Sequence, residues 1–184
     1  MADSMGHPLW APWRMEYLLA KKGGPCVFCH VEAADADELR TRFVVADTPH
    51  AFVIMNRYPF TAGHLLVVPH AHVSSLEELA PEAHHALFDL VRETTVRLRK
   101  AVRPDGLNVG LNLGAAAGAG IAEHMHVHVV PRWNGDTNFM PVLADTRVVP
   151  QALDATCDFL RSFFADLPDV RLPRGNNTSS EREG

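Results

Sequence analysis

The chain has 184 residues, of which 47% are hydrophobic and 21% are charged, a composition typical of one globular domain with a full core. Its formal net charge of −5 argues against a broad nucleic-acid-binding surface, because such a surface needs a basic patch. No apolar run is long enough to span a membrane, and the first residues lack the pattern of a signal peptide, so we expect a cytoplasmic protein that binds neither nucleic acid nor a membrane.

Three regions follow one another along the chain. Residues 1–42 are expected to form an irregular N-terminal arm, residues 43–165 the main domain, and residues 166–184 a polar, disordered tail. Within the main domain, residues 43–56 have the pattern of two strands joined by a turn at 48–50, and residues 63–69 that of a short buried strand.

One long helix is predicted to begin at Pro81, which suits the first position of a helix, and to end in the turn "RPDG" at 103–106. Its expected core-facing residues recur at three- and four-residue steps: His84, Leu87, Phe88, Val91, Thr94, Leu98 and Val102. Strands are predicted at 107–114 and 124–131, and a last helix within 150–164. These elements predict an α+β domain with a mainly antiparallel sheet of about five strands, one long helix and a C-terminal helix.

The segment "EHMHVHVVPRW" at 123–133 contains three histidines at alternate positions. Side chains alternate between the two faces of a strand, so His124, His126 and His128 are expected to share one face and the apolar residues between them the other. The apolar face can pack on the core, so the histidine face must meet a pocket, a metal ion or water.

This run resembles the signature of the histidine triad family, His-φ-His-φ-His-φ-φ with φ hydrophobic, which "HMHVHVV" at 124–130 matches at every position. "MNRYPFTAGHLLVVP" at 55–69 is similar to a segment of the fragile histidine triad branch. "LWAPWRMEYL", "LNVGLNLG" and "AEHMHVHVVPRWNGDTNF" resemble the bacterial diadenosine tetraphosphate phosphorylases of the family. The matching segments extend over roughly residues 9–160, and the resemblance implies the fold of that family.

The resemblance implies nucleotidyl transfer through a covalent nucleotidyl-histidine, with His126 as the nucleophile and His128 as a donor to the phosphate oxygens. It also implies four further substrate-binding positions, at which Asn56 contacts the ribose, His64 supports the site, Asn112 lies beside the phosphate and Gly120 faces the leaving group. A turn role is the alternative for Asn56, and a hydrogen bond to backbone alone is the alternative for His64. Relatives often carry glutamine or serine at the position of Gly120, so the substrate length preferred by this chain is left open.

A metal site is suggested by "CVFC" at 26–29, because a Cys-x-x-Cys pair is half of many four-ligand zinc sites. By resemblance to family members and to the hexose-1-phosphate uridylyltransferases, His72 and His124 complete the set with Cys26 and Cys29, around a structural Zn²⁺. His70 and His30 are alternatives to His72.

The resemblance therefore predicts an enzyme that cleaves dinucleoside polyphosphates, diadenosine tetraphosphate first, by phosphorolysis to ADP and ATP. Hydrolysis of dinucleoside polyphosphates or of nucleoside phosphoramidates to a nucleoside monophosphate is the alternative, and a non-catalytic nucleotide-binding protein is a third. Hexose-1-phosphate uridylyl transfer is disfavoured because that motif has glutamine where this chain has His128. The family also implies a homodimer, to which the apolar strand at 107–113 would contribute.

Overall fold

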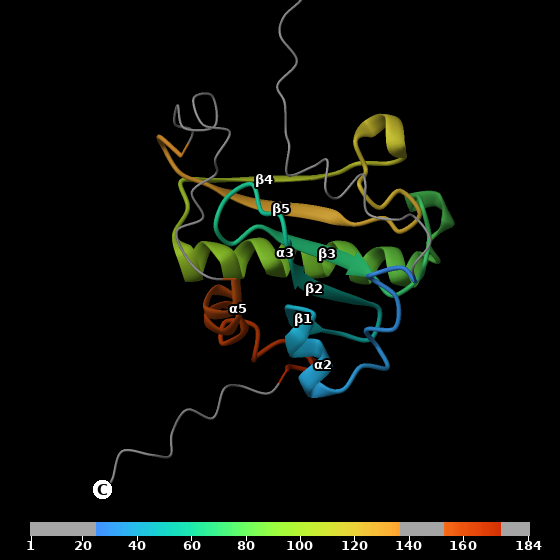
Figure 1. The fold of residues 1–184 in the computed structure, drawn as a ribbon, viewed down its shortest axis with the longest axis horizontal. Coiled ribbons are helices and arrows are strands. Elements are labelled where there is room, and N and C mark those ends of the chain that lie inside the picture. The colour runs from blue at the N-terminus through green and yellow to red at the C-terminus, as the bar shows by residue number, and fades with distance from the viewer. Residues whose placement is uncertain (1–24, 137–152, 174–184) are drawn as a thin grey trace, which may run out of the picture.

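The fold is built on one sheet of five strands, seen in a computed structural model that describes residues 25–136 and 153–173 (Figure 1). The strands are β1 (Val44–Asp47), β2 (Ala51–Met55), β3 (Leu65–Pro69), β4 (Gly106–Leu111) and β5 (Val127–Arg132). They lie in the order β1-β2-β3-β5-β4, and every neighbouring pair is antiparallel. The described helices are α2 (Ala36–Thr41), α3 (Pro81–Val102) and α5 (Leu153–Arg161), with single 3-10 turns η1 (Leu76–Glu78) and η2 (Ala115–Ala117). The predicted α+β architecture is confirmed.

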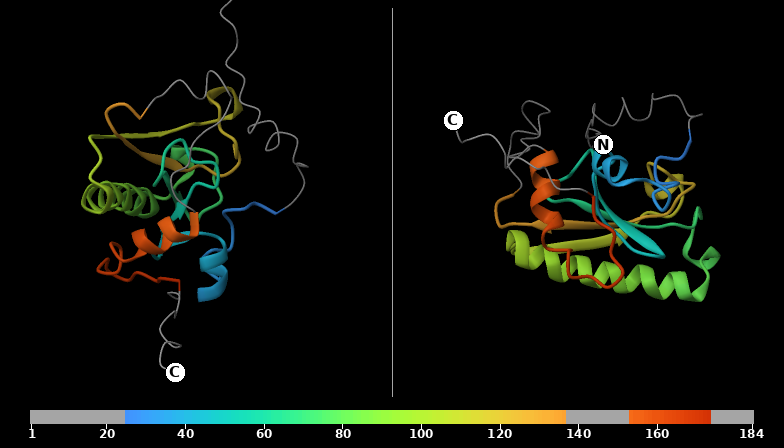
Figure 2. Two further views of the ribbon diagram at one scale, coloured as in Figure 1. Left: turned by 60° about the vertical axis from the view of Figure 1, so that its left-hand side comes forward. Right: turned by 90° about the horizontal axis from the view of Figure 1, so that it is seen from below.

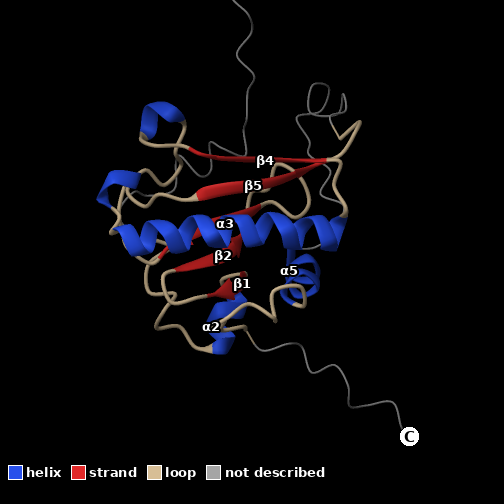
Figure 3. Cartoon of the chain, turned by 180° about the vertical axis from the view of Figure 1, so that it is seen from behind, coloured by secondary structure: helices blue, strands red, loops and turns tan. Residues whose placement is uncertain are grey.

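The long helix α3 covers one face of the sheet (Figure 3). Pro81 occupies its first turn, and Arg103 ends it in the left-handed conformation with a φ of 47°. The expected buried stripe is confirmed at four of its seven positions, His84 and Val102 are half-buried, and the prediction is wrong at Phe88, which is 38% exposed. Successive helix positions are rotated by about 100°, so Phe88 lies on the flank while Leu90 and Arg97 join the buried face.

The two faces of the sheet carry two different cores. Valines of β3 and β5, among them Val67, Val127 and Val129, pack with α3 on one face. On the opposite face a smaller cluster includes Phe28, Phe52 and Leu66. Figure 2 shows α3 on one side of the sheet and the N-terminal described segment on the other. The histidine side of β5 belongs to this second face, since His128 pairs with Leu66 across the β3–β5 ladder.

The strand that carries the histidines begins three residues later than predicted, at Val127 rather than His124. The backbone N–H of Met125 donates to the carbonyl of Val73, 2.8 Å away, instead of continuing the ladder with β3. The alternation of faces nevertheless persists: Met125 packs in the α3-side core, whereas the rings of His124 and His126 contact Phe28 on the other face.

The segments at the edges of the domain are more regular than the sequence suggests. Helix α2 lies inside the predicted irregular arm, and the Asp35 side chain caps it by accepting the N–H groups of Asp37 and Glu38. Residues 166–173 lie inside the predicted tail, yet Arg171 exchanges two backbone hydrogen bonds with Asp47 of β1. The "LWAPWRMEYL" arm and the rest of the tail, from residue 174, lie outside the described residues. None of the helices in the described part of the chain has the length and apolar character required to cross a membrane.

Candidate active site and metal cluster

The His126 ring is held in one orientation by the backbone of its own segment. Its Nδ1 donates to the carbonyl of His124 at 3.0 Å, and its ring is 5.2 Å from that of Phe28 and 5.0 Å from that of His128. With Nδ1 protonated in the neutral ring, Nε2 carries a lone pair. This Nε2 makes no hydrogen bond to a described residue. It is not one of the fully buried polar atoms among the described residues, although His126 as a whole is only 6% exposed.

A chain of hydrogen bonds determines which nitrogen of His128 carries its proton. The backbone N–H of Phe60 donates to His64 Nδ1 at 3.1 Å, so a neutral His64 has its proton on Nε2. That Nε2 lies 3.0 Å from His128 Nδ1, which must then accept. The remaining nitrogen of His128, Nε2, therefore carries an N–H. His126 thus has a free lone pair, while its neighbour has a free donor.

Both rings are neutral at physiological pH. Burial lowers the pKa of His126, and burial together with the nearby His126 lowers the pKa of His128 to about 4. The neutral form is the one in which His126 can act as a nucleophile and His128 can keep the tautomer described above.

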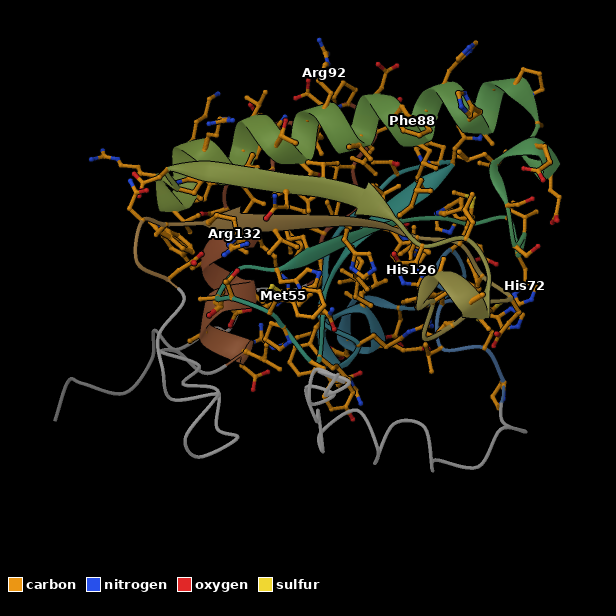
Figure 4. All side chains as sticks on the ribbon, turned by 90° about the horizontal axis from the view of Figure 1, so that it is seen from above. Met55, His72, Phe88, Arg92, His126 and Arg132 are labelled. Carbon is orange, nitrogen blue, oxygen red and sulfur yellow. The ribbon has the colours of Figure 1, made fainter. Side chains whose placement is uncertain are left out.

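An open groove of about 360 Å³ begins beside His128 and follows strands β4 and β5. It is lined by Phe60, Asn108, Val109, Gly110, Leu111, Asn112, His128, Val130 and Arg132. Figure 4 shows His126 and Arg132 toward opposite ends of these strands, with α3 and its Phe88 and Arg92 on the other side of the sheet. At the far end Arg132 donates to Asn108 Oδ1 at 3.0 Å and to both carboxylate oxygens of Asp136. The groove thus runs from the paired histidines to a polar end.

The predicted substrate-binding residues lie in different environments. Asn112 lines the groove just beyond the end of β4, and Gly120 is exposed in the following loop without lining it. His64 is fully buried behind His128, which fits support of that ring. The Asn56 Oδ1 accepts the N–H of Tyr58 in a turn, and its Nδ2 lies 3.3 Å from His64 Nδ1. In the structure Asn56 therefore has the turn role together with a contact to the support of His128.

Four side chains that were expected to bind metal converge at the other end of the histidine run. The ligand atoms of Cys26, Cys29, His72 and His124 all lie within 4.8 Å of one another, so this set could hold a metal ion. His124 Nε2 donates to the Pro69 carbonyl at 2.9 Å, which leaves Nδ1 directed at the sulfurs, 3.4 Å from that of Cys26. A metal-bound histidine commonly donates its second ring N–H in this way. The burial of Cys29 and the adjacent Cys26 thiol raise the pKa of Cys29, a shift that a bound cation would reverse.

The alternatives to His72 have other roles. His70 Nε2 lies 2.9 Å from both the Thr48 carbonyl and the Asp47 carboxylate. His72 Nδ1 instead lies 3.2 Å from the sulfur of Cys29. His30 takes no part in the cluster found among the described residues.

Phe28 connects the metal cluster to the nucleophile and was missed by sequence reasoning. It lies between the two cysteines, is 4% exposed, and places its ring against both His124 and His126. Asn108 and Gly110 in the groove lining were also missed, although the period-two pattern of the β4 segment places them on one face with the predicted Asn112.

Comparison with known proteins shows what the chain resembles. A family model described as the HIT domain matches residues 38–135. The AP-4-A phosphorylase of Mycobacterium tuberculosis is 37% identical over 171 residues, which cover 87% of this chain and 85% of that protein.

Solved structures are similar in fold. A Zn-bound histidine triad family protein from Mycobacterium smegmatis has a TM-score of 0.56 at 27% identity, covering 67% of this chain and 84% of that one. A hypothetical histidine triad nucleotide-binding protein from Sulfolobus tokodaii has a TM-score of 0.59 at 24% identity, covering 75% and 91%, and supports the fold alone. With the match to the family model over more than half of its length, the chain belongs to the histidine triad (HIT) family.

Proposed function

We propose that the protein transfers a nucleotidyl group through a covalent bond to His126 and cleaves dinucleoside polyphosphates, diadenosine tetraphosphate first. The observation that carries the proposal is the state of His126 Nε2, which is unbonded within the described part of the chain while Nδ1 donates to the His124 carbonyl. A neutral imidazole held in this way is a competent nucleophile near pH 7.

In the first step, Nε2 of His126 attacks the α-phosphorus of the substrate. A nitrogen–phosphorus bond forms, the bond from that phosphorus to the bridging oxygen breaks, and ATP leaves from diadenosine tetraphosphate. In the second step, an oxygen of inorganic phosphate attacks the same phosphorus, breaks the bond to His126 and releases ADP with the proton of the acceptor. Both steps move negative charge onto oxygens around the phosphorus.

The Nε2–H of His128 is the proposed donor to those oxygens, since its other nitrogen is held by His64. Asn112 lies in the same groove as His128 and is proposed to hold the phosphoryl group by its side-chain amide. Asn56 is proposed at the ribose and Gly120 near the leaving phosphates. The open groove leaves room for the part of the substrate that departs.

Phosphate is proposed as the acceptor because the Mycobacterium tuberculosis relative, 37% identical, is named AP-4-A phosphorylase. The test is to incubate the protein with diadenosine tetraphosphate, with and without inorganic phosphate, and to identify the products. Phosphorolysis predicts ADP and ATP in equal amounts that depend on phosphate. If the products are AMP and ATP in both buffers, the reaction is hydrolysis and the proposal of phosphorolysis is wrong.

The His126→Ala variant separates an enzyme from a nucleotide-binding protein. We expect turnover to fall by at least about 10³-fold, because the nucleophile itself is removed, while nucleotide binding persists. His84→Ala on α3 is the control, because that face of the sheet is opposite the site. Equal turnover in the two variants would contradict the proposed role of His126.

The metal proposed for the Cys26, Cys29, His72 and His124 cluster is a structural Zn²⁺. Bond lengths of about 2.3 Å to sulfur and 2.0–2.1 Å to nitrogen imply sulfur–nitrogen edges of roughly 3.5 Å in a tetrahedral site. Three of the four sulfur–nitrogen distances here are 3.2, 3.4 and 3.8 Å, and the fourth, between Cys26 and His72, lies within 4.8 Å. When bound, the ion would fix His124, whose carbonyl orients His126.

A homodimer is proposed through β4, which is the last strand at its edge of the described sheet. Val109 on this strand is 47% exposed, and a partner strand would cover it. The molar mass in solution, measured by light scattering after gel filtration, tests this, and a monomer at micromolar concentration would contradict it.

A further inference from the structure

The segment that follows α5 returns to the first strand of the sheet. The N–H of Asp47 donates to the Arg171 carbonyl at 3.0 Å, and the N–H of Arg171 donates to the Asp47 carbonyl at 2.7 Å. This short pairing brings the Arg171 side chain against the turns that directly follow Cys29, a stretch of residues 31–34 that we call the knuckle loop.

The Arg171 guanidinium binds the knuckle loop through three backbone carbonyls. Nη1 donates to Ala34 at 2.7 Å, and Nη2 donates to Val31 at 2.7 Å and to Glu32 at 2.9 Å. Nε donates to Oδ2 of Asp47 at 2.8 Å, which neutralises the cation. A planar fork of five donors can make such a set of bonds, whereas a lysine ammonium cannot.

These bonds help to position the knuckle loop, because residues 25–35 belong to no strand or helix. The buried side chains of Val31 and Ala34 hold the same loop from the core side. A second arginine holds the preceding turn: Arg42 donates to the carbonyls of Val27 and Cys29 at 2.8 and 2.9 Å. The two arginines together bind backbone on both sides of Cys29.

The Asp47 carboxylate also lies beside the segment that carries His72, another of the proposed metal ligands. Oδ1 of Asp47 is 2.9 Å from Nε2 of His70, two residues before His72. Asp47 therefore stands between the arginine that holds the cysteine side of the cluster and the loop that holds one of its imidazoles. His124 reaches the cluster from the segment that precedes β5.

We infer that Arg171 is a positioning residue of the metal cluster, which holds Cys26 and Cys29 at the distance from His72 and His124 that a tetrahedral divalent cation requires. This inference rests on the proposed metal site and is independent of the reaction proposed for His126. Without the guanidinium, the cysteine side of the cluster is tied to the domain mainly by Arg42 and by packing of Phe28 and Val31. The expected consequence is weaker metal binding.

The test compares Arg171→Lys with Arg97→Lys. Arg97 is the control because its guanidinium also donates to a backbone carbonyl and a carboxylate, those of Phe163 and Asp166, but it does not contact the knuckle loop. Its side chain is the more buried of the two, 7% exposed against 43% for Arg171, so its variant reports general destabilisation by the loss of a guanidinium. Zn²⁺ affinity is measured by competition with a chromogenic chelator, and the melting temperature of each full-length variant is measured alongside.

We expect Arg171→Lys to weaken Zn²⁺ binding by about 10–100-fold, the range for residues that orient metal ligands. Arg97→Lys is expected to lower the melting temperature and to change the Zn²⁺ affinity by less than about 3-fold. Arg171→Gln is measured in parallel, and it must also weaken Zn²⁺ binding.

Three outcomes would overturn the inference: unchanged Zn²⁺ affinity in either Arg171 variant, an equal loss in Arg97→Lys, or no Zn²⁺ binding by the unmodified protein. The last would also remove the metal proposal while leaving the proposed reaction to be judged by its own products. A loss of turnover without a loss of Zn²⁺ affinity would likewise count against a positioning role at the metal.

Discussion

His124 and His128 lie four residues apart in one run, yet the structure gives them opposite surroundings. His124 is fully buried, donates one nitrogen to the Pro69 carbonyl and turns the other toward two cysteines. His128 accepts from His64 and stands beside an open groove. The hydrogen bond at one ring nitrogen therefore determines what the other nitrogen can do. In His124 the second nitrogen is free to bind a metal, and in His128 it is free to donate a proton in a hydrogen bond.

His126 lies between these two ends and depends on both. Its Nδ1 is bonded to the carbonyl of His124, and its ring lies 5.0 Å from that of His128. A change at the closed end, where His124 faces the cysteines, should therefore act mainly on stability. A change at the open end, where His128 borders the groove, should act mainly on catalysis. The following predictions separate these two effects.

The largest effect is expected when the closed end loses a ligand. Cys26→Ser should abolish tight Zn²⁺ binding and remove the stability that the ion supplies, about 4 kcal/mol when free Zn²⁺ exceeds its Kd 1,000-fold. Chelator should lower the melting temperature of the unmodified protein but not that of the variant. Cys157→Ala is the control, since this buried thiol in α5 lies outside the cluster and should leave the response to chelator intact. The prediction is contradicted if chelator leaves the melting temperature of the unmodified protein unchanged.

At the open end, His128→Leu removes the donor and keeps most of the volume. We expect kcat to fall by about 10²–10³-fold, the usual effect of deleting one donor to a transition-state oxyanion. The Zn²⁺ content should change little, because the ring lies at the groove and outside the metal cluster. The melting temperature should fall modestly, because the buried Nε2–H of His64 loses its acceptor, a loss of about 1–3 kcal/mol. His128→Gln, which retains an N–H donor, should recover part of the loss. A leucine variant with more than a tenth of the normal kcat would show that His128 is not the donor.

The pH dependence of stability offers a weaker test of the same ring. The pKa of His128 in the fold is about 4, below its ordinary value of 6.5, because the ring is buried beside His126. As pH falls, His128 is therefore protonated in the unfolded chain before it is protonated in the fold. The stability contributed by the neutral His128 ring is fully present above pH 6.5 and is lost as pH falls toward 4.

In urea titrations between pH 7 and pH 5, the free energy of unfolding should fall more steeply for the unmodified protein than for His128→Gln. The two slopes should differ by at most about 1.4 kcal/mol per pH unit, the limit for one proton. Parallel curves would mean that the ring is not held neutral by the fold.

Much of the fold could be predicted from local pattern, because the signals lie within single elements. The start of α3 at Pro81 and the strands around residues 48–50 follow from turn chemistry and periodicity. The spacing of Cys26 and Cys29 indicates half of a metal site. Their partners His72 and His124 were found only through resemblance to a family, since nothing in the spacing of Cys29 and His124 requires that they meet.

What could not be predicted depends on contacts between distant parts of the chain. The run of histidines leaves the sheet before Val127 because Met125 binds the Val73 carbonyl, which belongs to a loop. Arg171 lies in a stretch that reads as a polar tail, and its bond to Val31 joins residues 140 positions apart. No local pattern indicates such a bond.

The smallest expected effect comes from Gly110, which pairs with His128 across the β4–β5 ladder and lines the groove. A methyl group added there meets no atom within 4 Å, so Gly110→Ala should raise the stability by about 0.5–1 kcal/mol, as alanine does relative to glycine in a strand. The same methyl group narrows the open end, and KM should rise by roughly 10-fold, since one methylene in a pocket changes binding by about 1–3 kcal/mol.

Gly106→Ala is the matched control for this change. It pairs with Arg132 in the same ladder, its added methyl group also meets no atom within 4 Å, and it does not line the groove. It should therefore bring a similar gain in stability with KM unchanged. Because glycine to alanine changes the backbone in the same way at both positions, a rise in KM at Gly110 alone reports the space beside His128. Equal KM values in the two variants would show that the substrate does not pass over Gly110.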